Sequence, residues 1–130
     1  MDPEALRILI VDDHEDSAEM LSVLLSGKGH ATRMALDGPT ALEVAAAFLP
    51  HVGLLDLGLP GMSGFELAER LRGMPGLSEM RLVAVTGHGS DAHRVKARAA
   101  GFTEHLLKPV DLDVMDALLE SVRRALAQAR

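Results

Sequence analysis

The chain contains no cysteine, tryptophan or tyrosine, and the absence of cysteine excludes the most kinds of site. Without cysteine it can form neither disulfides nor thiolate metal sites, which suits a reducing compartment. No apolar run approaches the roughly 18 residues of a membrane span, and the first residues lack the basic and apolar segments of a secretion signal. We therefore expect a cytoplasmic protein that does not enter a membrane.

The chain also has fewer basic than acidic residues: it contains 13 Lys and Arg and 19 Asp and Glu, which gives a formal net charge of −6. This balance argues against direct binding to nucleic acid or to an anionic membrane. What is present is a 48% share of hydrophobic residues, enough for a folded core. The length of 130 residues predicts a single domain, residues 1–130.

Apolar runs of strand length alternate along the chain with amphipathic segments of helix length. Strands are expected at 7–11, 30–35, 52–56, 81–86 and 103–107, and helices at 14–27, 38–48, 64–73, 90–100 and 111–128. The runs ILIV, VGLL and LVAV are almost continuously apolar, as in parallel strands covered by helices on both faces. The pattern predicts an α/β fold with a doubly wound, five-stranded parallel sheet in the flavodoxin-like order 2-1-3-4-5.

The weaker second and fifth runs are expected at the edges of this sheet. The last helix has the clearest amphipathic pattern. Its apolar stripe consists of Val114, Leu118, Leu119, Val122 and Leu126.

Polar residues stand at the ends of four of these strands: Asp12 and Asp13 after the first, Asp56 at the third, Thr86 at the fourth and Lys108 after the fifth. In a doubly wound sheet, ligands bind beyond the carboxyl ends of the strands, where the strand order reverses. Each pair of carboxylates 4 Å apart would repel by about 4 kcal/mol at an effective dielectric near 20. One lysine compensates only part of this charge, so we expect a divalent cation with oxygen ligands, and Mg²⁺ fits best.

Such a metal site would suit a phosphoryl group, whose oxygens the cation, Lys108 and the Thr86 hydroxyl would neutralise. One carboxylate could then act as a nucleophile and become an acyl phosphate. Asp56 is our candidate, because it closes the central strand.

The segments ILIVDD, LLDLGLPGMSG, VAVTG and AGFTEHLLKPV resemble, in order and over nearly the whole chain, the receiver domain of two-component response regulators. The resemblance implies that Asp56 accepts a phosphoryl group from the phosphohistidine of a sensor histidine kinase or phosphotransfer protein. Asp13, Asp56 and the backbone carbonyl of Gly58 would ligate Mg²⁺, with Asp12 assisting through water. Lys108 would pair with the phosphoryl oxygens.

The same resemblance implies how the signal would leave the domain. Thr86 would swing toward the phosphoryl group, and the face formed by the fourth helix, fifth strand and last helix would shift. A downstream effector domain or protein would read that shift, and a weak homodimer is a further expectation. Pro109 looks like the family's proline after the lysine, where a cis peptide is common and would help to aim Lys108 inward. Gly87 matches the small residue that leaves room for the donor.

Three positions depart from the family's usual pattern. His105 stands at the family's switch position, three residues before the lysine, where Tyr or Phe is usual. Because imidazole ordinarily titrates near about pH 6.5, an inward movement of this ring is expected to depend on pH. Gly58 replaces a larger residue, and His88 stands two residues after Thr86; both positions flank the phosphoryl group and are expected to set the lifetime of the acyl phosphate. LPGMSGFELAERLR and GFTEHLLKPVD are especially similar to receivers attached to hybrid histidine kinases.

Each residue alone has a plainer interpretation: Asp12 or Asp13 as a helix cap, Thr86 as a strand former and Lys108 as a surface lysine. Six scattered histidines without cysteine argue against a zinc site. The joint pattern favours a phosphoacceptor signalling module that is not itself an enzyme. Two alternatives stay open. One is a degenerate receiver that only binds proteins, and the other is a hydrolase of the dehalogenase type, in which Gly58 stands in place of the second acid.

Overall fold

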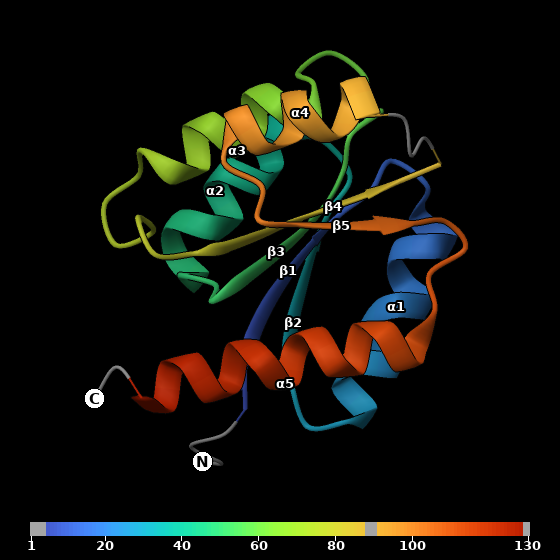
Figure 1. Cartoon of the computed structure of the whole chain (residues 1–130), viewed down its shortest axis with the longest axis vertical. Helices are drawn as coiled ribbons and strands as arrows, with labels where there is room; N and C mark the ends of the chain where they lie inside the picture. The colour runs from blue at the N-terminus through green and yellow to red at the C-terminus, as the bar shows by residue number, and fades with distance from the viewer. Residues whose placement is uncertain (1–4, 88–90, 129–130) are drawn as a thin grey trace.

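The computed structural model describes residues 5–87 and 91–128, and their helices and strands alternate along the chain (Figure 1). The strands are β1 (Arg7–Val11), β2 (Ala31–Ala35), β3 (Val52–Asp56), β4 (Arg81–Thr86) and β5 (Glu104–Leu107). The helices are α1 (Glu15–Gly27), α2 (Gly38–Phe48), α3 (Gly64–Arg72), α4 (Asp91–Ala100) and α5 (Leu112–Gln128). Every segment predicted from the sequence is confirmed, with no boundary displaced by more than one residue.

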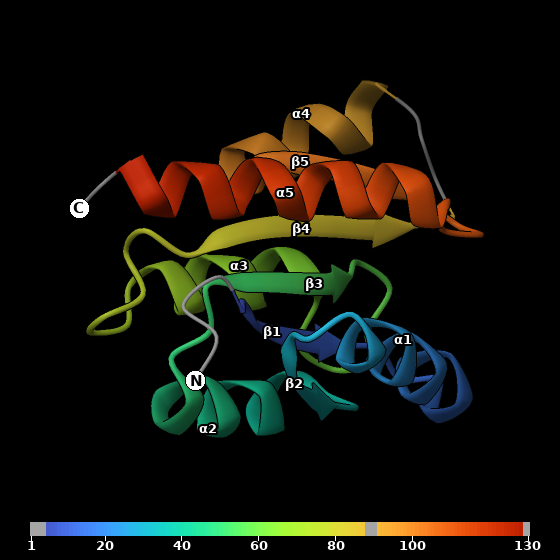
Figure 2. The ribbon, with the colours of Figure 1, turned by 90° about the horizontal axis from the view of Figure 1, so that it is seen from below.

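The strands form one parallel sheet in the order β2-β1-β3-β4-β5, and Figure 2 shows them one above another in this order. The predicted flavodoxin-like order is therefore confirmed, and β2 and β5 are the edge strands. Because all strands run the same way, their carboxyl ends meet at one edge of the sheet. The order reverses between β1 and β3, so the residues that end these strands lie next to each other there.

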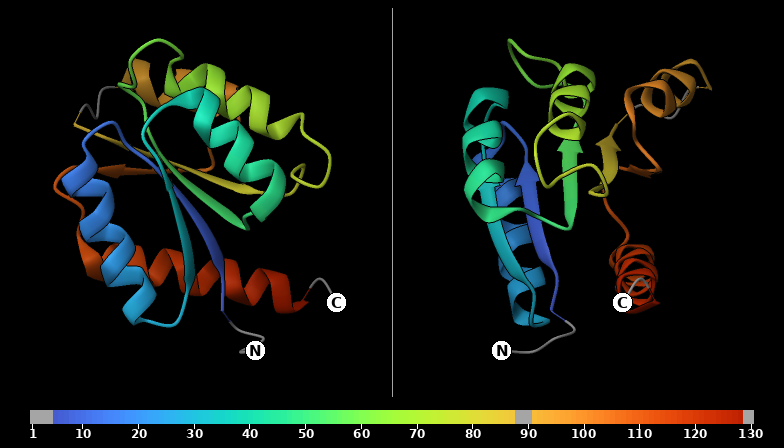
Figure 3. Two further views of the ribbon diagram at one scale, coloured as in Figure 1. Left: turned by 180° about the vertical axis from the view of Figure 1, so that it is seen from behind. Right: turned by 90° about the vertical axis from the view of Figure 1, so that its left-hand side faces the viewer.

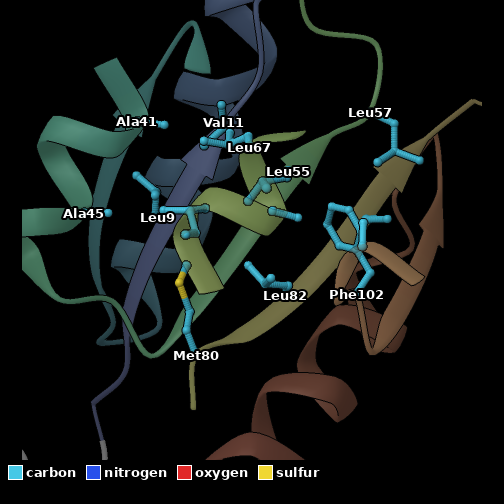
Figure 4. Close-up of a cluster of buried hydrophobic side chains, with 14 of the residues drawn as sticks. Leu9, Val11, Ala41, Ala45, Leu55, Leu57, Leu67, Met80, Leu82 and Phe102 are labelled. Carbon is cyan, nitrogen blue, oxygen red and sulfur yellow. The ribbon is translucent and has the colours of Figure 1, made fainter. Parts of the chain in front are cut away.

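Helices cover both faces of the sheet, with α1 and α5 on one side and α2, α3 and α4 on the other (Figures 1 and 3). Alternate residues of β1 serve the two sides: Leu9 and Val11 pack in the cluster beneath α2 and α3 (Figure 4), and Ile8 and Ile10 pack in the cluster beneath α1 and α5. None of the four is more than 2% exposed. Burial on both faces explains why the central strands are continuously apolar. Each large apolar side chain that is fully buried stabilises the fold by about 1.5–3 kcal/mol.

Helix α5 is less deeply buried than its apolar stripe suggests. Met115, Leu119 and Val122 are at most 3% exposed, whereas Val114 and Leu126, at the two ends of the stripe, are 49% and 36% exposed. The apolar stripe therefore extends beyond the part of the helix that packs on the sheet. Among the described residues, no helix combines the length and apolarity needed to cross a bilayer.

Two histidines hold the amino end of the central strand β1. The Leu6 N–H donates to His30 Nδ1 at 3.3 Å, and the Arg7 N–H donates to His51 Nδ1 at 2.9 Å. These histidines directly precede β2 and β3, the two strands that flank β1. Burial, and then the charge of Arg7, lower the pKa of His51, which favours the neutral ring that can accept this hydrogen bond.

Candidate metal and phosphoacceptor site

Asp56 lies at the carboxyl end of β3, in a strand whose five residues are all buried. Its own exposed fraction is 8%. The Gly58 N–H donates to Oδ1 at 2.9 Å, and Lys108 Nζ donates to Oδ2 at 3.0 Å. Because both oxygens have a donor, the carboxylate is held in one orientation at the edge of the sheet.

Gly64 allows helix α3 to begin directly against the backbone of Asp56. A Cβ atom at position 64 would lie 2.6 Å from the Asp56 carbonyl oxygen and 2.8 Å from Leu57 Cα. Ser63 caps the helix at this point by accepting the Glu66 N–H at 3.2 Å. The packing role of Gly64 was not predicted from the sequence. The pattern that could have revealed it is a glycine at the first position of a helix that a serine caps.

Asp12 and Asp13 lie between β1 and α1, beside Asp56. Asp12 is 8% exposed; its Oδ1 accepts the His14 N–H at 2.9 Å, and its Oδ2 accepts Lys108 Nζ at 3.3 Å. Asp13 is exposed. The N-cap of α1 is His14, so the plain interpretation of either aspartate as its cap is wrong.

Lys108 joins the two buried carboxylates. Burial, the largest single influence, lowers the pKa of Lys108, but the hydrogen bonds and charges of Asp56 and Asp12 together outweigh it and hold the pKa above its ordinary value. The Lys108 N–H donates to the Thr86 carbonyl oxygen at 2.8 Å, which ties the lysine to the end of β4. Thr86 is 3% exposed. The peptide between Lys108 and Pro109 is cis, as expected.

Four side chains offer metal ligands in one cluster, namely Asp12, Asp13, His14 and Asp56, with one ligand atom from each and all of these atoms within 4.8 Å of one another. Carboxylate oxygens are the donors that hard divalent cations prefer, so these residues fit the expected metal. His14 Nδ1 lies 3.4 Å from an oxygen of Asp12 and 3.4 Å from one of Asp13. Sequence reasoning missed His14, although it directly follows the two aspartates.

The other predicted positions vary in their relation to this cluster. A Cβ at Gly58 would make an ordinary contact of 3.6 Å with Asp56 Oδ1, and one at Gly87 would meet nothing within 4 Å. His105 pairs with Ala84 in the sheet and lines a surface groove with two arginines of α4, outside the acidic cluster. His88 lies outside the described residues.

The chain belongs to the response regulator receiver domain family, whose model matches residues 8–120. Among curated proteins it is 35% identical to the response regulator PleD of Caulobacter vibrioides over 118 residues, which are 91% of this chain and 26% of PleD. It is 37% identical over 109 residues to the DNA-binding response regulator MtrA of Mycobacterium tuberculosis, covering 84% of this chain and 46% of MtrA. The chain thus spans about a quarter to a half of these relatives.

Solved structures agree with this membership. The chemotaxis protein CheY4 of Vibrio cholerae matches with a TM-score of 0.86 and 27% identity, over 91% of this chain and 98% of that one. The receiver domain of a histidine kinase from Syntrophus aciditrophicus matches with a TM-score of 0.83 and 25% identity, over 93% and 92%. The resemblance to receivers is confirmed, and an origin in a hybrid kinase stays a prediction.

Proposed function

We propose that this chain is a phosphoacceptor module in which Asp56 takes a phosphoryl group from the phosphohistidine of a sensor histidine kinase or phosphotransfer protein. The observation that carries the proposal is the contact of Lys108 Nζ with both Asp12 and Asp56 at the edge of an acidic cluster. A lysine and several carboxylates that converge at the switch point of a doubly wound sheet form a site for a cation and a phosphoryl group.

The transfer follows from how Asp56 is held. One carboxylate oxygen attacks phosphorus, an O–P bond forms as the P–N bond to the donor imidazole breaks, and that imidazole takes up a proton from solvent. Lys108 pairs with the phosphoryl oxygens as they approach. The Gly58 N–H, 2.9 Å from Asp56 Oδ1, keeps the carboxylate facing the donor.

Asp13, Asp56 and the Gly58 carbonyl are the proposed ligands of Mg²⁺, with Asp12 assisting through water. When bound, the cation supplies positive charge to the carboxylates and to the transferred phosphoryl oxygens. The three aspartates in the cluster fit such an ion by their chemistry and their spacing.

The proposed output is a shift of the face formed by α4, β5 and α5, which a downstream effector domain or protein would read. A weak homodimer is a further proposal. Thr86 is the proposed reporter of the phosphoryl group, because it is buried at the end of β4 and its carbonyl accepts the Lys108 N–H. Gly87 and Pro109 keep their proposed roles in donor access and lysine placement, and His105 its role as the switch. Gly58 and His88 are proposed to set the acyl-phosphate lifetime.

The proposed setting is a single receiver domain over residues 1–130 in the cytoplasm, without direct contact to nucleic acid or membrane. PleD and MtrA are both longer than this chain. We propose that the response depends on the domain or protein that the receiver contacts.

The test is the mass of the intact chain after incubation with Mg²⁺ and a small-molecule phosphodonor. We expect one added phosphoryl group, no addition to Asp56→Asn, and full addition to Asp113→Asn, which removes an exposed carboxylate from α5. Full labelling of Asp56→Asn would falsify the assignment. Absence of both labelling and Mg²⁺ binding in the unmodified chain would favour the degenerate receiver, and steady phosphate release over many turnovers would favour the hydrolase.

A further inference from the structure

His14 brings a nitrogen donor to a site whose other side-chain donors are all carboxylate oxygens. It is the N-cap of α1, but its side chain makes no capping hydrogen bond. The side chain is 72% exposed, and Nδ1 nevertheless lies 3.4 Å from Asp12 Oδ1 and 3.4 Å from Asp13 Oδ1. An exposed ring beside two carboxylates can turn to share a cation with them.

These spacings match those of a coordination shell. With metal–ligand bonds of about 2.1 Å, neighbouring donors lie roughly 3.0 Å apart in an octahedral site and about 3.4 Å apart in a tetrahedral one. The His14 ring already has this separation from two carboxylates. The whole cluster, which spans 4.8 Å, needs only a small contraction to surround one ion.

The donor set determines which ion is favoured. Mg²⁺ is a hard cation that prefers oxygen ligands and retains its waters, whereas imidazole suits transition ions such as Co²⁺ and Zn²⁺. A site made only of carboxylates already binds Co²⁺ and Zn²⁺ more tightly than Mn²⁺, following the Irving–Williams order. The contribution of the His14 ring is therefore measured as the part of the preference for transition ions over Mg²⁺ that is lost when the ring is removed.

We propose that His14 is a further metal ligand, which shifts the site from Mg²⁺ toward transition-metal cations. The inference rests on the proposed metal site of Asp13 and Asp56 and adds to it the class of ion. The six histidines of the sequence pointed away from a zinc site because they are scattered, but one of them, His14, is placed by the structure against the carboxylates.

The experiment measures Co²⁺ and Mg²⁺ affinities by calorimetric titration for the unmodified chain, His14→Ala and His30→Gln. His14→Ala removes no side-chain cap, so the fold should persist. His30→Gln removes an imidazole at the opposite edge of the sheet. We expect a Co²⁺ affinity lower by about tenfold or more in His14→Ala only, since even an outer-shell partner of a ligand contributes roughly 10- to 100-fold. The Mg²⁺ affinity should change by less than about twofold, since Mg²⁺ does not need the ring.

A second measurement observes the ring directly. The ¹⁵N resonance of His14 Nδ1 should move when Zn²⁺ alone is added and stay in place with Mg²⁺ alone. Zn²⁺ binding that leaves this resonance unmoved, or equal losses of Co²⁺ and Mg²⁺ affinity in His14→Ala, overturns the inference but leaves phosphoryl labelling of Asp56 intact. If no divalent ion binds to the unmodified chain, the inference and the proposed metal site both fail.

Discussion

Replacing Gly64 by alanine tests how the fold holds the backbone of Asp56. The new Cβ would lie 2.6 Å from the Asp56 carbonyl oxygen and 2.8 Å from Leu57 Cα. Both are backbone atoms, so no side-chain rotation can relieve the contact. The first turn of α3 and the end of β3 must therefore move apart, and the carboxylate of Asp56 moves with its strand.

The expected cost follows from two opposing effects. Overpacking a close contact destabilises a protein by about 1–3 kcal/mol. Replacing glycine by alanine in a compatible helical position stabilises by roughly 0.4–1 kcal/mol. The net expectation for Gly64→Ala is a destabilisation of about 1–2 kcal/mol, together with slower phosphorylation of Asp56.

Urea unfolding followed by far-ultraviolet circular dichroism suits this chain, because it lacks Trp and Tyr as fluorescent reporters. The matched control is Gly27→Ala, at the last residue of α1, where a Cβ meets nothing within 4 Å. The control should gain roughly 0.4–1 kcal/mol. If Gly64→Ala is as stable as Gly27→Ala, the packing argument is refuted.

Two further predictions concern charge. Lys108→Met should lower the free energy of unfolding at neutral pH by about 1–2 kcal/mol, because it leaves Asp12 and Asp56 without their cation in a pocket where the lysine side chain is 33% exposed and partly screened. It should also slow phosphoryl labelling; an unchanged urea midpoint and labelling rate would exclude both effects. For His51, the folded-state pKa is lowered, first by burial and then by Arg7, so the stabilisation by the neutral ring is complete above its ordinary pKa of about 6.5 and is lost as the pH falls through the lower folded-state value. Urea midpoints measured from pH 8 to pH 5 should therefore fall less steeply for His51→Gln than for the unmodified chain, and parallel pH profiles would contradict this linkage.

Much of the architecture could be predicted from local patterns. The three continuously apolar runs became β1, β3 and β4, each buried on both faces, and the two weaker runs became the edge strands. Strand ends converge on one edge in a parallel sheet, so the polar residues that follow them had to lie near one another. The contacts of Lys108 with Asp12 and Asp56, 96 and 52 residues away in sequence, confirm that expectation.

Other features depended on distances that no local pattern contains. Val114 and Leu126 belong to the apolar stripe of α5 but stay exposed, because the part of the stripe that is buried depends on how the helix packs on the sheet. His105 pairs with Ala84 at an edge strand and lies apart from the acidic cluster, so its role as a switch stays a prediction.

By itself the sequence determined the alternation of strands and helices and the carboxylates that end the strands, because hydrophobic period and chain order encode these directly. The strand order was predicted from the fold that is typical of such an alternation, and the pairing of the strands in the structure confirmed it. Only the tertiary structure decided that Gly64 must lack a Cβ beside Asp56 and that the His14 ring lies 3.4 Å from two carboxylates. Such approaches of a few ångströms depend on how α1 and α3 sit against the ends of β1 and β3. Close packing across the whole domain sets those positions, and no residue's own propensity specifies them.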